Sequence, residues 1–255
     1  MRSSHVTQAV VLRSRPFAES DKIVSFLTEN YGKITGIAKG AKRSRKRFVN
    51  SLEPITLVNL HFHDPPHSSL AFIQASDLLL SFHKLVTSLE KISFASYLVE
   101  ITDGLIGERE ENRLVFQHLR DGLHHIEESG TSLKFLTWYE LKLLRLTGYQ
   151  PALENCKLCG QDLHAVAAAR WHFSPCDGGI LCESCSRVRR DLLPLAVTAL
   201  EALRDLQAEK SMMPSRISLP SSMVREIRSA VLRFIQFHMD KEIKSAPFLY
   251  QFSSM

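Results

Sequence analysis

The sequence predicts an α+β chain of more than one domain, with a small N-terminal β-barrel followed by an all-helical domain that carries an inserted four-cysteine module. Three observations predict this class. Five short segments of alternating apolar residues fill the first part of the chain, the apolar period becomes helical after about Asp77, and two Cys-x-x-Cys pairs interrupt the helical part. We expect the barrel at residues 1–78, helical segments at 79–151 and 189–255, and the cysteine module at 152–188.

Alternation of apolar and polar residues predicts five strands, at residues 7–13, 22–29, 33–39, 55–63 and 70–76. Turn-forming residues separate them, among them Tyr31-Gly32 and Asp64-Pro65-Pro66. Side chains alternate along a strand, so one face of the fourth strand is expected to carry Thr56, Val58, Leu60 and Phe62, and the other Ile55, Leu57, Asn59, His61 and His63. Five short strands in a row favour a small barrel.

Helical spacing of apolar residues defines the rest of the chain. Residues 133–146 are apolar nearly all round and precede Gly148, a residue suited to a helix C-terminus, so this helix is expected to be buried. Pro247 cannot belong to the closing helix. The other stripes are Ile92, Ala95, Val99, Thr102 and Ile106; Val115, Leu119 and Leu123; Ala196, Leu200, Leu203 and Leu206; and Val224, Ile227, Val231, Ile235 and Met239.

Composition narrows the class of protein. The chain has 255 residues, of which 44% are hydrophobic and 23% charged, and this balance is typical of a globular protein with a real core. Its net charge of +5 favours anionic partners. No apolar run approaches the roughly 18 residues of a membrane span, and the first residues alternate instead of forming a signal sequence. We therefore expect a cytoplasmic protein with no membrane partner.

Four of the five cysteines form two Cys-x-x-Cys pairs, Cys156 with Cys159 and Cys182 with Cys185, separated by residues 160–181. Two such turns supply the four thiolates that tetrahedral zinc prefers, so we expect a zinc site; an iron–sulfur cluster and unligated thiols are the alternatives. A site closed by four sulfurs leaves no position for water, so the zinc is expected to be structural. Cys176 is a free thiol, a substitute ligand or a redox-sensitive position.

Enzyme motifs are scarce. The sequence contains no P-loop, no glycine-rich dinucleotide motif after a strand and no nucleophile elbow. His61 and His63, with Asp64 and His67 nearby, suggest a metallohydrolase as one alternative, and a polar strand end running into a surface turn as the other. No general-base cluster accompanies these histidines, so we expect that the protein is not an enzyme.

The segment Lys39 to Phe48 follows the third predicted strand and carries six cations and no acid. Charge runs are often only solvated, and a nuclear localisation stretch is another interpretation. OB-fold barrels, however, bind single-stranded nucleic acid by combining a basic groove with aromatic side chains. The position after a barrel strand therefore favours nucleic-acid binding, with Phe17, Tyr31 and Phe48 as residues that either stack on bases or belong to the core.

Several motifs, taken in order, resemble the RecO family of bacterial DNA repair and recombination mediators over nearly the full length. In the N-terminal part they are Glu19 to Ile23, Phe26 to Glu29, Tyr31 to Lys33 and Ala38 to Lys42. The middle contributes Tyr97 to Glu100, Tyr139 to Leu144 and Gly148 to Pro151, and the cysteine module contributes Cys156 to Gly160, Phe173-Ser174 and Gly178 to Cys185.

The resemblance implies an N-terminal OB-fold, an all-helical domain and a zinc module inserted in it. It further implies a non-enzymatic protein of the nucleoid-associated cytoplasm that binds single- and double-stranded DNA and anneals complementary strands. The partners it implies are RecR, the C-terminal tail of single-strand-binding protein and, indirectly, RecA. We expect the DNA face of the barrel to be lined by Lys33, Lys39, Lys42, Arg43, Arg45, Lys46 and Arg47, and to be extended by Arg187, Arg189 and Arg190.

Two further classes remain open. A zinc-ribbon protein that binds RNA or the ribosome would share the basic barrel and the cysteine pairs. A pure protein adaptor would act through its helices and bind nucleic acid weakly. The sequence does not identify the residues that contact RecR or single-strand-binding protein, the oligomeric state, the role of Cys176 or the order of the basic loop without DNA.

Overall fold

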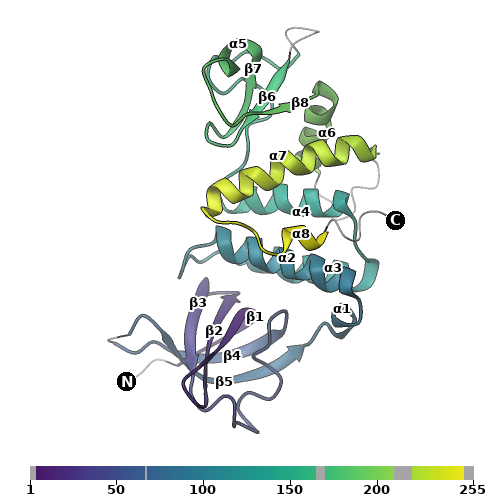
Figure 1. The fold of residues 1–255 in the computed structure, drawn as a ribbon. Helices are drawn as coiled ribbons and strands as arrows, with labels where there is room; N and C mark the ends of the chain where they lie inside the picture. Colours follow the sequence, from purple (N-terminus) through teal and green to yellow (C-terminus); the bar gives the residue numbers. More distant parts are fainter. Residues whose placement is uncertain (1–3, 67, 165–169, 210–219, 250–255) are drawn as a thin grey trace. The chain divides into compact units, whose positions relative to one another are not determined.

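The fold was examined in a computed structural model that describes residues 4–66, 68–164, 170–209 and 220–249 (Figure 1). The chain divides into two units, one formed by Met1–Gly130 with Lys244–Met255 and the other by Thr131–Ile243. The predicted domain limits at residues 78, 151 and 188 stay predictions.

The first unit contains a closed five-stranded barrel, which confirms the predicted strands. Its strands run in the order β1-β2-β3-β5-β4, with β3 and β5 parallel, as in an OB-fold (Figure 1). β1 is twice as long as predicted, because its first part pairs with β4 and its later part with β2, and a bulge between Val11 and Arg13 shifts the register with β2. The strands are β1 Ser4–Phe17, β2 Asp21–Thr28, β3 Lys33–Ala38, β4 Leu57–His63 and β5 Ala71–Leu80.

The fourth strand shows how the alternation places the barrel core. Val58, Leu60 and Phe62 are fully buried in the core, as the pattern predicts. On the other face, His61 lies 3.2 Å from Asp77, and the His63 ring lies 5.0 Å from the ring of Phe72. Within the described part of the chain, neither histidine joins a group of potential metal ligands, and His67 lies outside that part. At the end of β4, His61 is thus placed beside a carboxylate, and His63 is buried against an aromatic ring.

Among its described residues the first unit also contains the helices α1 His83–Val86, α2 Leu89–Leu105, α3 Arg113–Ser129 and α8 Ala246–Leu249. Ser88 and Asn112 accept backbone N–H groups at the first turns of α2 and α3, which explains where these helices begin. α2 buries more than its predicted stripe because it packs against both β1 and α3. The backbone N–H groups of Lys244 and Ser245 donate to Glu100 of α2 and attach the last segment to this unit.

The second unit combines helices with a small sheet. Its elements are α4 Leu133–Leu146, β6 Trp171–Ser174, β7 Gly179–Cys182, α5 Glu183–Ser186, β8 Leu193–Leu195, α6 Val197–Ala208 and α7 Ser221–Met239. The sheet, in the order β7-β6-β8, extends beyond the predicted cysteine turns. Pro247 lies outside α7, as predicted, in the separate short helix α8.

Gly148 ends α4 as predicted. Its φ is +83°, and its N–H donates to the Arg145 carbonyl while the N–H of Tyr149 donates to that of Leu144. This pair of bonds is a Schellman motif, which requires a left-handed residue and so favours glycine. α4 is buried on most of its surface, since α6 and α7 both pack against it. Among the helices of the described residues, none has the length and apolar character to cross a membrane.

Candidate nucleic-acid interface and metal centre

The basic loop, defined here as residues 39–50, leaves the barrel at the end of β3 and is attached to it along its length. The Gly40 N–H donates to the Asp21 carboxylate at 2.8 Å, and the Lys42 N–H donates to the Ser20 carbonyl at 2.9 Å. Farther along, the Arg47 carbonyl accepts the Ser76 N–H at 2.9 Å. The loop is therefore a folded part of the barrel surface.

The six cations of this loop are all exposed, but they differ in their contacts. Lys42 donates to the carbonyls of Ala18 and Glu19, and Arg47 donates to the Lys39 carbonyl, so these two side chains also fold the loop. Arg43 lies 3.8 Å from Glu19, both highly exposed. The exposed cations are Lys39, Lys42, Arg43, Arg45, Lys46 and Arg47.

Arg45 and Lys46 have no hydrogen-bond or ion-pair partner among the residues that the structure describes. Beside them is a cleft of about 550 Å³ that Lys42 and Arg45 help to line, with Phe48 among its lining residues. Exposed ion pairs contribute little, so the guanidinium of Arg43 is also accessible to a competing anion. This part of the loop suits phosphate groups.

The three aromatic residues considered at the sequence level have different positions. Phe48 is only 6% exposed and belongs to the barrel core, and the Tyr31 ring packs against those of His5 and Phe62. Phe17 is 47% exposed at the end of β1. It directly precedes Ala18, whose carbonyl accepts from Lys42, so Phe17 is the exposed aromatic residue of the three and is adjacent in sequence to a contact of the basic loop.

Asp21 fixes the first turn of the loop. The Gly40 N–H holds the pKa of the Asp21 carboxyl below its ordinary value, with further help from Ser20 and from the charges of Lys39 and Lys42. Because the folded pKa is lowered, the contribution of this carboxylate is complete above about pH 4 and is lost as the pH falls through the folded value.

Asp21→Ala is expected to free the Gly40 N–H, because no acceptor remains at that position. Amide exchange measured by NMR should then be several-fold faster at Gly40. Ser20→Ala, which removes only the hydroxyl that donates to Asp21, is the control and should change exchange less. Equal Gly40 exchange in Asp21→Ala and the unaltered protein would contradict this role.

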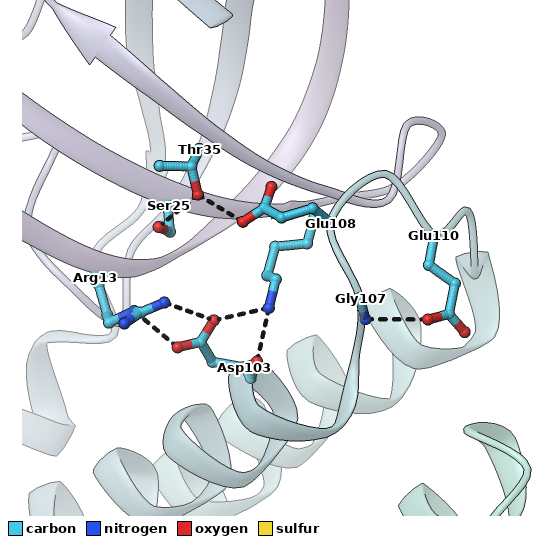
Figure 2. A network of polar contacts seen from close by, with 8 residues as sticks. Arg13, Ser25, Thr35, Asp103, Gly107, Glu108 and Glu110 are labelled. Carbon is cyan, nitrogen blue, oxygen red and sulfur yellow. Dashed lines mark hydrogen bonds and ion pairs between the residues drawn. The ribbon is translucent and has the colours of Figure 1, made fainter. Parts of the chain in front are cut away.

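Lys33 is placed differently from the other cations of the predicted DNA face. It is 8% exposed, and its ammonium donates to the Asp103 carbonyl at 2.8 Å and lies 3.4 Å from the Asp103 carboxylate. Figure 2 shows the surrounding network, in which Arg13 also reaches Asp103 and Thr35 donates to Glu108. Lys33 is thus buried in joining β3 to α2, unlike the exposed cations of the basic loop.

Three more arginines of the predicted face lie in the second unit. Arg189 pairs with Asp177 at 3.1 Å, and Arg187 lies 4.0 Å from Glu183. Arg190 is exposed and has no partner within the described ranges. These three residues form a basic stretch of the cysteine module.

The four cysteines of the two pairs come together at one end of the small sheet. Their sulfur atoms all lie within 4.8 Å of one another, and the Cys159 and Cys182 sulfurs are 3.7 Å apart. Sulfurs bound to tetrahedral zinc at about 2.3 Å lie roughly 3.8 Å from each other. The spacing and the all-sulfur donor set therefore fit a four-coordinate metal ion.

Two backbone features form this cluster. The Cys156 carbonyl accepts the Gly160 N–H at 2.8 Å in a tight turn, where Gly160 has a φ of +75°. Gly179 lies so close to residue 152 that a Cβ there would be 2.4 Å from the Ala152 carbonyl oxygen. The glycines that precede and follow the cysteine pairs thus let the two turns approach each other.

The ionisation of the four sulfurs is coupled through their hydrogen bonds. Burial raises the pKa of the Cys156 thiol, but N–H groups of Cys182, Cys159 and Leu158 outweigh it and lower the pKa to about 6. Hydrogen bonds with Cys182 and Cys159 raise the pKa of Cys185 to about 12. The two pKa shifts have opposite directions because the sulfurs share hydrogen bonds, and a bound cation would favour the thiolate form of all four.

Cys176 does not belong to this cluster. It is exposed in the turn between β6 and β7, with its sulfur 3.3 Å from the Ser174 hydroxyl.

His124, Glu127 and Glu128 form a second group of potential metal ligands, but Lys84 contacts both of its carboxylates. The Lys84 ammonium pairs with Glu128 at 2.9 Å and the Lys84 N–H donates to Glu127.

Two family models match the chain in succession. The model described as "Recombination protein O N terminal" matches residues 1–82, and "Recombination protein O C terminal" matches residues 86–247. The chain belongs to the RecO family. Family members act in DNA repair and recombination, so the chain has a role in these processes.

Full-length RecO relatives agree with this assignment. A DNA repair protein RecO of Syntrophus aciditrophicus (strain SB) is 36% identical over 259 residues, covering 100% of this chain and 98% of that protein. The DNA repair protein RecO of Caldanaerobacter subterraneus subsp. tengcongensis is 30% identical over 97% of this chain and 98% of its own. The DNA repair protein RecO of Myxococcus xanthus (strain DK1622) is 30% identical, and the match covers 95% of this chain and 96% of that protein.

Proposed function

We propose that this protein is a non-enzymatic recombination mediator that binds single- and double-stranded DNA and anneals complementary strands. With RecR, it would place RecA on single strands coated by single-strand-binding protein, whose C-terminal tail it would contact, in the nucleoid-associated cytoplasm. The observation that carries this proposal is the basic loop, on which six exposed cations are held in one folded segment at the end of β3.

The four cysteines hold a structural zinc ion in this proposal. Cys156, Cys159, Cys182 and Cys185 would be its ligands, and the metal would fix the two turns of the module. No reaction step passes through the metal, since four sulfurs leave no open coordination position.

Annealing needs no chemical energy source because base pairing supplies the driving force. The protein must lower the repulsion between two phosphate backbones and keep the strands close. Arg43, Arg45 and Lys46 are the cations best placed for this, because their side chains do not fold the loop. Contacts of this kind bind backbones without reading bases, so affinity should depend little on sequence.

Reversal of charge at Arg43, Arg45 and Lys46 (each→Glu) tests the loop. At about 0.1 M salt, loss of three phosphate contacts should weaken single-stranded DNA binding roughly 100-fold. If all six loop cations contact phosphates, log affinity should fall against log salt with a slope of about −4, and the triple variant should give about −2. Fluorescence anisotropy with a labelled oligonucleotide, measured over a salt series, gives both quantities.

A charge-preserving variant, Arg43→Lys with Arg45→Lys, is the matched control and should bind DNA nearly as well as the unaltered protein. Binding by the triple Glu variant with unchanged affinity would show that the loop is only solvated. Stronger binding of structured RNA, without DNA annealing, would favour the RNA-binding class. Weak and salt-insensitive binding of all nucleic acids would favour the adaptor.

A further inference from the structure

A second cleft that combines cations with an exposed aromatic ring lies in the second unit. Its volume is about 550 Å³, within the range of clefts that bind small ligands. One wall is the cysteine module, with Cys176 in the β6–β7 turn and Arg190 after α5. The other wall is the end of α7. The residues that concern us are Cys176, Arg190, Arg233, Gln236, Phe237 and Lys241.

Several contacts fix the two walls. The Phe173 ring of β6 meets the Phe234 ring of α7 edge-on, with centroids 5.4 Å apart. Across the same junction, Arg233 lies 3.6 Å from Asp191, and β8 packs against α7. The cleft is thus a formed feature of this unit.

Phe237 has a half-exposed ring that packs against a neighbouring ring. Its side chain is 51% exposed, although burial of a phenylalanine is favourable. The ring meets His238 edge-on at 5.4 Å and 81°, and His238 is itself stacked on Tyr149 at 4.3 Å. A held, half-exposed ring is what an unpaired base needs for stacking.

The charges of the cleft determine the kind of occupant. Arg190 and Lys241 have no partner within the described residues, whereas Arg233 is shared with Asp191. Asp191, Asp240 and Glu242 also line the cleft, so its three cations face three acids. A site without net charge attracts a polyanion weakly, and binding here must depend mainly on stacking.

We propose that this cleft is a second site for single-stranded DNA, in which one unpaired base stacks on Phe237. Gln236 precedes Phe237 in the sequence, and its side-chain amide would form hydrogen bonds with the edge of that base. Arg190 and Lys241 would contact the phosphates on either side of it. The inference rests on the proposed function, because annealing requires two strands held at once and the basic loop accounts for one. It predicts a stacking site on the second unit that responds little to salt.

Cys176 supplies a direct reporter of occupancy. It lines the cleft and is exposed, whereas the other four cysteines belong to the sulfur cluster. A thymidine oligonucleotide should therefore slow the alkylation of Cys176 by iodoacetamide. The extent of alkylation is measured by peptide mass spectrometry. The Cys176→Ser variant identifies the signal. An oligonucleotide with abasic sites, which has the same phosphates and no bases, should protect much less.

Phe237→Ala supplies the second arm. Loss of one stacked base should weaken binding of the thymidine oligonucleotide about fivefold or more, equally at low and high salt. The same change should affect the abasic oligonucleotide little, and Phe237→Trp should keep the affinity. Phe248→Ala is the matched control, because Phe248 is 52% exposed in the other unit and should leave affinity unchanged.

Equal protection of Cys176 by both oligonucleotides, or none by either, would overturn the inference, as would unchanged affinity in Phe237→Ala. Protection by an acidic peptide alone would also overturn it and assign the cleft to a protein partner. If Phe237→Ala misfolds, the protection measured on the unaltered chain still decides. If the unaltered protein fails to bind DNA at all, the proposed function fails; if only the basic-loop variant loses affinity, this inference alone fails.

Discussion

Removal of the zinc ion proposed for the four-cysteine site is expected to unfold the two cysteine turns of the second unit. In zinc-binding peptides the metal contributes roughly 10–16 kcal/mol of apparent binding free energy, which is also folding free energy. Cys156→Ser should therefore release about one zinc ion per chain, as measured by elemental analysis. Hydrogen exchange should then be faster at residues 155–162 and 182–186, which form the turns.

The rest of the small sheet should respond less, because it has apolar contacts of its own. Trp171 and Phe173 are buried, and Phe173 packs on Phe234 of α7. Cys176→Ser is the matched control, since this exposed cysteine lies outside the cluster and its loss should not change metal content. Absence of any metal in the purified, unaltered protein would refute the zinc proposal.

Breaking the buried ion pair between α4 and α7 is expected to destabilise the second unit strongly. The guanidinium of Arg228 meets the carboxylate of Glu140, and the two side chains are 1% and 0% exposed. Arg228→Met removes the cation and leaves the Glu140 carboxylate buried without its counter-charge. Such a change typically costs about 3–5 kcal/mol.

Tryptophan fluorescence during urea unfolding measures this loss, because both tryptophans of the chain, Trp138 and Trp171, lie in the second unit. The double variant Glu140→Leu with Arg228→Met is the control. It removes both charges, so most of the stability should return. A single variant as stable as the unaltered protein would show that the pair contributes little.

The pattern of apolar residues predicted most of the fold because burial acts on every strand and helix in the same way. Alternation at Val58, Leu60 and Phe62 identified the core face of β4, and Gly148 identified the end of α4. The strands β6 to β8 were missed as a sheet, since each has only three or four residues and a pattern that short carries no clear period. Burial of α2 on two sides arises from packing against α3, which a single stripe cannot show.

Some features of the candidate sites could be predicted from the sequence and others could not. The spacing of the four cysteines predicted that their sulfur atoms would lie close together, because each pair forms a local turn. The fate of Lys33 could not be predicted from its neighbours, since its partner Asp103 is 70 residues away. Phe48 lies beside the loop cations in sequence, yet its place in the barrel core depends on residues of several strands.

Glu140 and Arg228 show most clearly what the sequence pattern could not predict. Both are charged residues on helices with apolar stripes, and they lie 88 positions apart in the sequence. Each alone is compatible with an exposed position on its helix. Their pairing depends on how α4 and α7 pack, which only the three-dimensional structure gives.

Annealing of complementary oligonucleotides coated with single-strand-binding protein, followed by fluorescence energy transfer, is the decisive measurement for the basic loop. The unaltered protein and the Arg43→Lys, Arg45→Lys variant should anneal the coated strands. The Arg43, Arg45 and Lys46→Glu variant should fail to do so while keeping its fold. Annealing by that variant at the rate of the unaltered protein would contradict the assignment of the loop to the DNA backbone.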